Sequence, residues 1–185
     1  MKAVLTAVAV LMLSMSGYAQ TVTKSANGAI IDCSAFKSDG FTKVKKARTT
    51  YADDDDWHKP VKEDYTDIAS RVSNEKIYYK LEVSGTEHSS EERMKWKVAI
   101  NVCARLTIDG GNWRVPTKRE LVLIWVLHPE LKKIAGFTPF HDFPYWSATG
   151  SNSPLLGWTV RFGNGSTSVA GWISRLRVRC VRDID

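Results

Sequence analysis

Hydrophobic and polar positions alternate along residues 77–83. Ile77, Tyr79, Leu81 and Val83 fall on one side of this stretch, and Tyr78, Lys80 and Glu82 fall on the other. A period of two residues is typical of a β-strand with one buried face. The pattern predicts a half-buried strand.

A helical period replaces the alternation in residues 89–106. The apolar positions with this spacing are Trp96, Ala99, Ile100, Cys103 and Leu106. Ser89 and Glu92, three residues apart, have the form of a capping box. We therefore expect an amphipathic helix over 89–106 with Cys103 on its buried face, ended by Gly110–Gly111.

A second helix is predicted to begin after Pro116. Thr117 and Glu120 have the spacing of another capping box, and Leu121 and Ile124 form an inward stripe. Pro129 interrupts the pattern, and a short turn of helix is expected to continue towards Gly136.

No helical period follows Gly136. Residues 136–146 form an aromatic and proline-rich loop, and YWSAT at 145–149 reads as a short strand. Alternation returns in 157–162, and Asn164–Gly165 is a strong hairpin signal. The order of one strand, two helices, a long loop and several short antiparallel strands predicts the α+β class.

The last predicted strand, RLRVRCVRD at 175–183, is rich in arginine. Alternation places Leu176, Val178 and Cys180 inward, and Arg175, Arg177 and Arg179 outward. The arginines could form a basic stripe that binds a polyanion, or they could be the outer positions of a core strand.

The first 19 residues read as a secretory signal peptide. Lys2 precedes an apolar stretch from Ala3 to about Met15, and Gly17 and Ala19 fit a cleavage site after Ala19. The stretch is shorter than the roughly 20 helical residues that span a bilayer. Since no second long apolar run follows, we expect a soluble, secreted protein without a membrane span. A retained anchor is the less favoured alternative.

The cysteine count and the charge both bear on an exported protein. The three cysteines, Cys33, Cys103 and Cys180, allow one pair and one remaining thiol in an oxidising compartment. Residues 20–94 carry 12 basic and 14 acidic side chains, whereas residues 95–185 carry 13 basic and 6 acidic ones. The basic half favours an anionic partner, and export argues against nucleic acid as the main ligand.

Candidate catalytic and metal-binding motifs are weak. Asp53–Asp56 lacks the alternating ligands and central glycine of an EF-hand, which favours a solvated acidic loop. The four histidines form no metal-spaced pair, and His141–Asp142 has no evident nucleophile beside it. GNGS at 163–166 precedes a predicted strand rather than a helix, so it is not a phosphate loop. We expect no metal, no cofactor and no catalytic residues.

Five ordered segments resemble a known family. MKWKVAINVCARL, NWRVPTKRELVLIW, YWSAT, GWTVRFGNG and VRCVRD are similar to the C-terminal domain of bacterial collagen-like adhesins, the Lcl-C type. The resemblance covers residues 77–185 and leaves residues 20–76 as an unassigned N-terminal extension. It implies a C-type-lectin-like fold, with two helices packed on short twisted antiparallel sheets.

The resemblance also implies a disulfide. In C-type-lectin-like domains a cysteine of the first helix bridges to one of the last strand, which here are Cys103 and Cys180. Such a bridge would contribute about 4 kcal/mol on the chain-entropy model. Cys33 would then be free and buried, or paired between molecules.

Two activities of related folds lack their residues here. Calcium-dependent lectins carry Glu-Pro-Asn or Gln-Pro-Asp and Trp-Asn-Asp, where this chain has Ser153–Leu155 and Trp158–Val160. Sulfatase-modifying enzymes have a segment that resembles Trp113–Glu120. They also need a redox-active pair of cysteines a few residues apart, whereas this chain has a single cysteine near its end.

The resemblance favours a non-catalytic module that binds a glycan or surface polymer, acidic or sulfated, through residues 137–157 and 163–166. Candidate ligand-binding residues are Lys132, Lys133, His141, Asp142, Trp146, Arg161, Asn164, Arg175 and Arg177. Trp158 and Trp172 are also aromatic, but alternation favours the core for both. The family ending implies that Arg179 and Arg182 are structural. The alternative is a structural component of a surface fibre, attached to a partner protein through residues 20–76 and Cys33.

Overall fold

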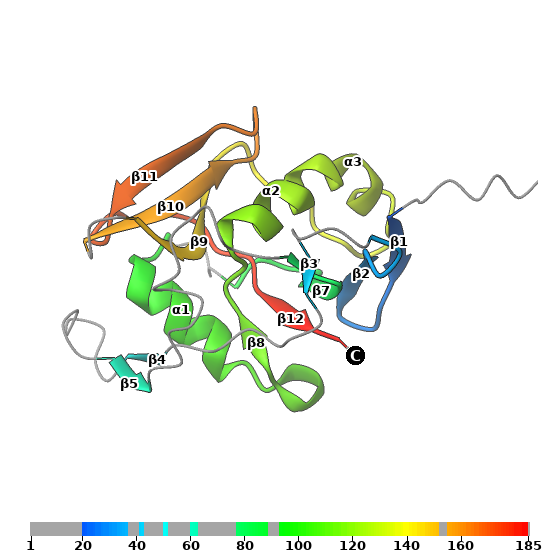
Figure 1. The fold of residues 1–185 in the computed structure, drawn as a ribbon, viewed down its shortest axis with the longest axis horizontal. Helices are drawn as coiled ribbons and strands as arrows, with labels where there is room; N and C mark the ends of the chain where they lie inside the picture. The colour runs from blue at the N-terminus through cyan, green and yellow to red at the C-terminus, as the bar shows by residue number, and fades with distance from the viewer. Residues whose placement is uncertain are drawn as a thin grey trace, which may run out of the picture.

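The protein has an α+β fold, as the pattern predicts (Figure 1). A computed structural model describes residues 20–36, 41–42, 50–51, 60–62, 77–88, 93–151 and 155–184. The helices are α1 (Trp96–Arg105), α2 (Lys118–Val126) and α3 (His128–Leu131), with a 3-10 turn at Ile108–Gly110. The strands are β1 (Thr21–Lys24), β2 (Gly28–Asp32), β3 (Phe41–Thr42), β4 (Thr50–Tyr51), β5 (Pro60–Lys62), β6 (Ile77–Tyr78), β7 (Lys80–Ser84), β8 (Trp113–Arg114), β9 (Pro144–Gly150), β10 (Leu156–Arg161), β11 (Thr167–Gly171) and β12 (Val181–Asp183). The likeness to the C-type-lectin-like fold stays a prediction.

Five strands form the larger sheet, in the order β1-β2-β7-β12-β8, with antiparallel neighbours. The strand predicted over 77–83 is divided at Tyr79 into β6 and β7. Its predicted polar face is wrong for Glu82, which is buried together with Leu81 and Val83. β7 lies in the middle of the sheet with a paired strand on each edge, and Glu82 is buried where Arg182 of the neighbouring β12 pairs with it.

The N-terminal hairpin β1–β2 belongs to this sheet. Ala29 pairs with Val83 and Ile31 pairs with Leu81, and both β2 residues are fully buried. The hairpin therefore extends the five-stranded sheet beyond β7, across the boundary predicted before residue 77. The short apolar patch at 29–31 is too brief to show a period, which is why the pattern alone left this segment unassigned.

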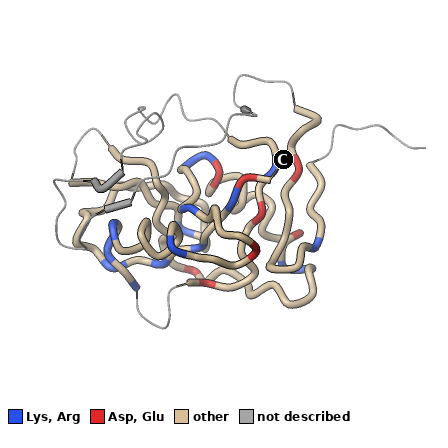
Figure 2. The backbone as a smooth tube through the Cα atoms, turned by 90° about the horizontal axis from the view of Figure 1, so that it is seen from below, with Lys and Arg blue, Asp and Glu red and all other residues tan. Residues whose placement is uncertain are grey.

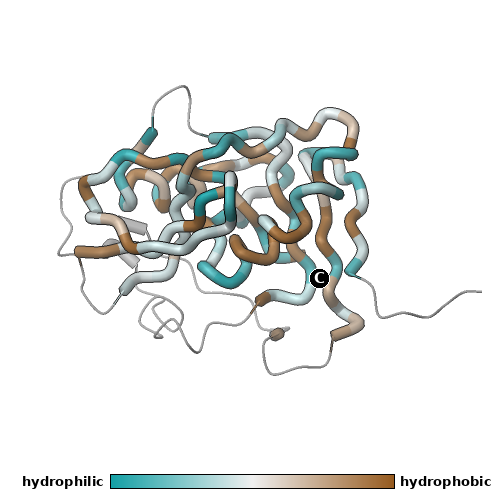
Figure 3. The backbone as a smooth tube through the Cα atoms, turned by 90° about the horizontal axis from the view of Figure 1, so that it is seen from above, coloured by the Kyte–Doolittle hydropathy of each residue, from teal (hydrophilic) through white to brown (hydrophobic). Residues whose placement is uncertain are grey.

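The smaller sheet, β11-β10-β9, lies between two helices (Figure 1). On one face, Trp96 of α1 packs in a hydrophobic cluster with Trp146. On the other face, Leu121 and Ile124 of α2 share a second cluster with Val160. A Cβ atom at Gly157 would lie 3.0 Å from the Trp96 ring, so this glycine lets α1 approach the sheet closely. In Figure 3 hydrophobic and hydrophilic positions alternate along much of the tube, as expected for helices and strands with one apolar and one polar face.

The predicted start is correct for one of the two helices and wrong for the other. At α2 both bonds of the capping box between Thr117 and Glu120 are present, which confirms that prediction. α1 begins at Trp96 rather than at Ser89, because Met94 pairs with Leu176 in an antiparallel bridge. The other predicted capping box, at residues 89–92, lies outside the described residues, as do the predicted signal peptide and the acidic run at 53–56.

The hairpin signal at Asn164–Gly165 is confirmed by β10 and β11, which pair antiparallel on either side of it. Gly165 has a φ of 73°, in the left-handed region that favours glycine. A Cβ atom there would also lie 2.6 Å from the Trp125 ring, so the turn rests directly on α2.

Candidate anion-binding surface

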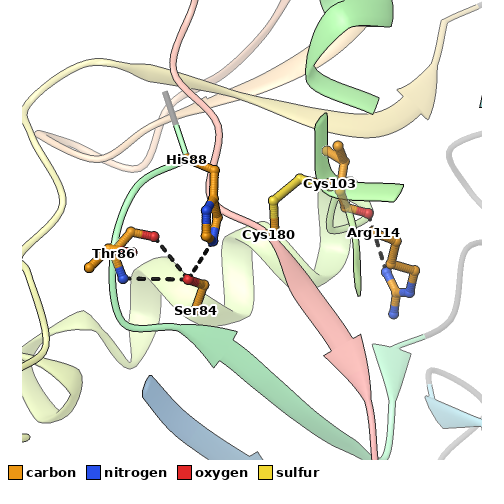
Figure 4. Close-up of a disulfide and its surroundings, with 7 residues drawn as sticks. Ser84, Thr86, His88, Cys103, Arg114 and Cys180 are labelled. Atoms are coloured by element: carbon orange, nitrogen blue, oxygen red, sulfur yellow. Dashed lines mark hydrogen bonds between the residues drawn. A yellow bond between two sulfur atoms is a disulfide. The ribbon is translucent and has the colours of Figure 1, made fainter. Parts of the chain in front are cut away.

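A disulfide joins α1 to the segment before β12 (Figure 4). Cys103 and Cys180 are bonded, with their Cα atoms 5.5 Å apart and both side chains fully buried. The pairing implied by the family resemblance is therefore confirmed. Cys33 is free and buried, and burial raises the pKa of its thiol to about 11, so of the two predicted fates of Cys33 the structure shows the buried thiol.

A serine and a histidine lie beside the disulfide (Figure 4). The Oγ of Ser84 is 2.7 Å from Nε2 of His88, and its hydroxyl donates to the Thr86 carbonyl oxygen at 3.0 Å. Which group donates, the Ser84 hydroxyl or the His88 ring, depends on the tautomer of the imidazole. Ser84 is 3% exposed and His88 is half-buried.

Arg179 is a buried structural arginine, and its predicted outward direction is wrong. It donates to the carbonyl oxygens of Ser84 at 3.0 Å and Thr138 at 2.9 Å. Its guanidinium lies over the rings of Phe137 and Phe140, at 5.1 and 4.4 Å from their centroids. Burial lowers the pKa of Arg179 to about 10, which leaves it charged at neutral pH.

Arg182 is also structural, as the family resemblance implied for both arginines. It forms ion pairs with Glu82 and Asp109 and lies 5.1 Å from the centroid of the Trp113 ring. The Arg179 side chain points inward rather than outward because residues 175–180 lie outside regular strands. β12 begins only at Val181, so side chains before it need not alternate between two faces.

Arg177 points to the edge of the core. Its Nη1 lies 2.5 Å from Oε2 of Glu87, with side-chain exposures of 20% and 8%. Glu87 also accepts from the hydroxyl of Tyr145 and lies 3.8 Å from Arg179. Burial and the Glu87 hydrogen bond raise the pKa of Tyr145, so its hydroxyl stays protonated and keeps donating to Glu87.

A bridge between distant segments gathers four cations. Met94 and Leu176 exchange backbone hydrogen bonds of 2.8 and 3.1 Å in an antiparallel bridge. This register brings Arg93 beside Arg177 and Lys95 beside Arg175. We call these four residues the basic cluster: Arg93, Lys95, Arg175 and Arg177.

Phe143 lies within the basic cluster. The guanidinium of Arg93 is 4.0 Å from the centroid of its ring, and that of Arg177 is 5.7 Å away. Arg93 and Arg175 are exposed, and Lys95 is half-buried. Like charges on paired segments repel one another, so this surface favours an anion. In Figure 2 several short blue segments lie on the part of the tube farthest from the C-terminus.

Sequence reasoning found Arg175 and Arg177 but missed Arg93, Lys95 and Phe143. Arg93 and Lys95 lie just before α1, where the predicted helix would have spread them around its surface. Only the register of the Met94–Leu176 bridge places them against Arg177 and Arg175. No local pattern carries that register.

Four further predicted residues lie at or near the β10–β11 hairpin. Nε of Arg161 donates to Asp142 at 2.9 Å, and both side chains are more than half exposed. The Asp142 carboxylate lies where a side chain at Gly163 would start, 1.9 Å from a Cβ atom placed there. Asn164 accepts from the Ser166 amide, which is a turn contact. His141 is exposed beside Asp142.

Lys132 and Lys133 follow α3 and are both exposed. Lys133 pairs with Glu130 at 2.7 Å, three residues earlier on the same turn. No contact joins either lysine to the basic cluster among the interactions found for the described residues.

Trp146 lies in the core rather than on the surface where the predicted ligand would bind. Its side chain is fully buried, and its Nε1 donates to the Met94 carbonyl oxygen at 2.8 Å. Alternation on β9 aims it at α1, and it fills the core there. Trp158 and Trp172 are half-buried, and Nζ of Lys118 lies 4.2 Å from the centroid of the Trp158 ring.

The fold and these contacts define an α+β domain with one internal disulfide and a basic surface. Within the part of the chain that the structure describes, no three His, Cys, Asp or Glu side chains are grouped to hold a metal ion. The family model described as the Lcl C-terminal domain matches residues 80–182, more than half of the chain. The protein therefore belongs to the Lcl C-terminal domain family, which is associated with collagen-like adhesins that are secreted or at the cell surface.

A search of the curated proteins found no match. None of the helices described here has the length and apolar character needed to cross a membrane.

Proposed function

We propose that the protein is an exported, non-catalytic binding module that recognises an anionic glycan or surface polymer without calcium. The observation that carries the proposal is the basic cluster, in which the register of one bridge gathers three arginines and a lysine from two distant segments. Of the described residues, Glu87 pairs with Arg177 and so brings a carboxylate to the cluster.

The chemistry of arginine supports an oxyanion ligand. A guanidinium presents several N–H donors in one plane and binds sulfate or carboxylate groups with two parallel hydrogen bonds. Cations at alternate positions of two adjacent segments suit a polymer that carries repeated charges. The family association with collagen-like adhesins and the predicted signal peptide both fit recognition outside the cell.

Calcium-independent and non-catalytic binding is proposed from the residues present. The carboxylates with which calcium-dependent lectins hold the ion and the sugar are replaced at 153–155 and 158–160. The Ser84 side chain that contacts His88 is buried, so it presents no hydroxyl to a dissolved substrate.

The test is retention of the mature chain, residues 20–185, on immobilised heparin with and without calcium. The wild type is expected to be retained equally in both conditions. R175A is expected to elute at clearly lower salt, and the combined R93A/K95A/R175A/R177A variant to lose retention.

Lys24 supplies the matched control, because it is an exposed cation on β1 rather than in the basic cluster. K24A removes the same charge and is expected to elute close to the wild type. Equal losses for K24A and R175A would show that retention reflects net charge alone and would overturn the proposed site. No retention of the wild type, with co-purification in a large complex, would favour the structural component instead.

The same column separates the other predicted residues. K132A/K133A tests the end of α3, and R161A tests the hairpin beside Asp142. If either variant loses more retention than R175A, the binding surface lies there and not at the basic cluster.

A further inference from the structure

We propose that Phe143 is a positioning residue of the anion-binding surface, which holds the guanidinium groups of Arg93 and Arg177 as one unit. The inference rests on the proposed function, because it concerns the same surface. It assigns a role to an aromatic residue that makes no charged contact with the ligand itself.

The Phe143 ring is shared by two arginines from distant segments. Arg93 lies 4.0 Å from the ring centroid, within the usual range of a cation–π contact, and Arg177 lies 5.7 Å from it. Arg93 precedes α1, whereas Arg177 precedes β12. The ring therefore ties together the two halves of the basic cluster that the Met94–Leu176 bridge brings into register.

The backbone holds the ring in place. The Phe143 carbonyl oxygen accepts from the Phe162 amide at 3.2 Å, and its amide donates to the His141 carbonyl oxygen at 2.7 Å. The next residues belong to β9, where Tyr145 forms a parallel bridge with Arg177. Phe143 and Arg177 are thus fixed to the same strand end.

The ring is not needed to fill the core. Phe143 is half-buried and is not among the described residues that form the two hydrophobic clusters. Phe140, three residues earlier, is 6% exposed and stacks on Phe162 with ring centroids 3.8 Å apart. The contrast separates an aromatic side chain that packs in the core from one that supports arginines at the surface.

Stacking on an aromatic ring suits an arginine that must bind an anion. A guanidinium over the face of a ring keeps its N–H donors in its own plane, where an oxyanion can reach them. The ring also limits the rotamers of a long side chain, so less conformational entropy is lost when the anion binds.

Glu87 fixes Arg177 from the other side. Its carboxylate accepts a hydrogen bond from Nη1 of Arg177 at 2.5 Å and another from the Tyr145 hydroxyl. Arg177 is thus held between a carboxylate and a ring, whereas Arg93 is the more exposed partner. Loss of the ring should therefore release Arg93 more than Arg177.

The experiment measures the Kd for a size-defined heparin oligosaccharide, together with the melting temperature of each variant. F143L, which removes the ring, is expected to weaken binding about 5-fold. F143W keeps an aromatic face and is expected to restore affinity. The melting temperature of F143L is expected to stay close to that of the wild type.

A double-mutant cycle tests the coupling directly. R93A is expected to weaken binding strongly in the wild type and much less in F143L, because the released arginine contributes less. W158L is the matched control, since Trp158 is a half-buried aromatic residue under the cation of Lys118 but lies outside the basic cluster. R93A is expected to have the same effect in W158L as in the wild type.

The outcomes separate this inference from the proposed function. If the wild type does not bind heparin, the proposed function fails and the role of Phe143 fails with it. If the wild type binds while F143L binds equally well, or if R93A and F143L are additive, only the role of Phe143 is overturned. If F143L proves unstable, F143M keeps a similar volume without a ring, and the cycle with R93A is repeated on it with the same two outcomes.

Discussion

His128 shows how burial sets the chemistry of a single side chain. It is 9% exposed, and its Nε2 accepts from the Phe140 amide at 3.3 Å. The edges of two aromatic rings, Phe140 and Phe162, contact the imidazole. Burial, and then the charges of Lys132 and Arg179, lower the pKa of His128 to about 4.

The lowered pKa of His128 predicts acid sensitivity. The unfolded chain binds a proton at this residue near pH 6.5, whereas the folded chain binds it only near pH 4. The contribution of His128 is therefore fully present above pH 6.5 and is lost as the pH falls to about 4, a change of about 3 kcal/mol at most. Urea unfolding at a series of pH values from 4 to 8 measures this change in the free energy of unfolding.

H128Q can keep an acceptor near the Phe140 amide without titrating, so its free energy of unfolding should vary less between pH 6.5 and 4. The pKa of His88 is lowered as well, by burial and then by Arg179, so H88Q should reduce part of the same slope. A slope unchanged in both variants would contradict the assignment.

Cys33 is expected to be unreactive in the folded protein. Its thiol is 1% exposed and its pKa is raised to about 11 by burial, so little thiolate is available to a reagent. A thiol reagent should label the native chain slowly and label one thiol per chain after unfolding without reductant. Rapid labelling of the native protein would show that this region opens.

At the scale of elements, a buried ion-pair network joins three of them. Arg114 of β8 donates to Glu120 of α2 at 2.7 Å and to Asp183 of β12 at 2.6 Å. Glu120 is fully buried and also caps α2 and accepts from the Tyr78 amide. The two carboxylates raise the pKa of Arg114 against the opposing effect of burial, so the arginine stays charged.

Breaking this network is predicted to destabilise the fold. E120Q removes the charge that faces the buried Arg114 and should lower the free energy of unfolding by about 3 kcal/mol. E130Q is the control, because Glu130 and its partner Lys133 are both more than half exposed. It should change stability by less than about 1 kcal/mol in chemical denaturation.

The disulfide acts between elements in a different way. Cys103 and Cys180 are 77 residues apart in sequence, so the bridge mainly restricts the unfolded chain. The C103S/C180S variant is predicted to lose about 4 kcal/mol of unfolding free energy, measured by chemical denaturation. Unchanged stability would mean that the bridge contributes little beyond the packing of α1.

At the scale of the whole molecule, binding to the basic cluster should be linked to stability. An anionic ligand that binds only the folded chain raises its melting temperature, and here it also relieves repulsion between the four cations. Dextran sulfate is predicted to raise the melting temperature of the wild type and to do so less in 0.5 M salt, where about 4 Å of screening length remains.

Neutral dextran is the control for this measurement and should leave the melting temperature unchanged. The R93A/K95A/R175A/R177A variant should show little response to either polymer. An equal rise in this variant would place the polyanion elsewhere on the molecule.

The parts of the fold that could be predicted are those with local causes. Thr117 and Glu120 are three residues apart, so their capping box can be read directly and is present. Gly165 permits a turn that its own backbone requires, and the hairpin follows. The spacing of Trp96, Ala99 and Cys103 likewise placed the buried face of α1 correctly, although the start of the helix was set elsewhere.

The parts that could not be predicted depend on pairing between distant segments. Trp146 was expected at the ligand, but its place opposite α1 is decided by how β9 and α1 pack. Arg179 was expected to face solvent. It lies in the core instead, because carbonyl oxygens of two other segments accept hydrogen bonds from its guanidinium. Neither fact has a local signal in the chain.

The class of fold and the family could be read from the chain alone, because periodicity, capping and ordered motifs each involve nearby residues, and the family resemblance then implied the disulfide partners. Which cations share a surface depends on tertiary pairing. Arg93 and Lys95 join Arg175 and Arg177 through a single backbone bridge, whose register no local pattern encodes. Side-chain direction outside regular strands is likewise set by the partners that surround each residue, as Arg179 in the core and Arg175 at the surface show.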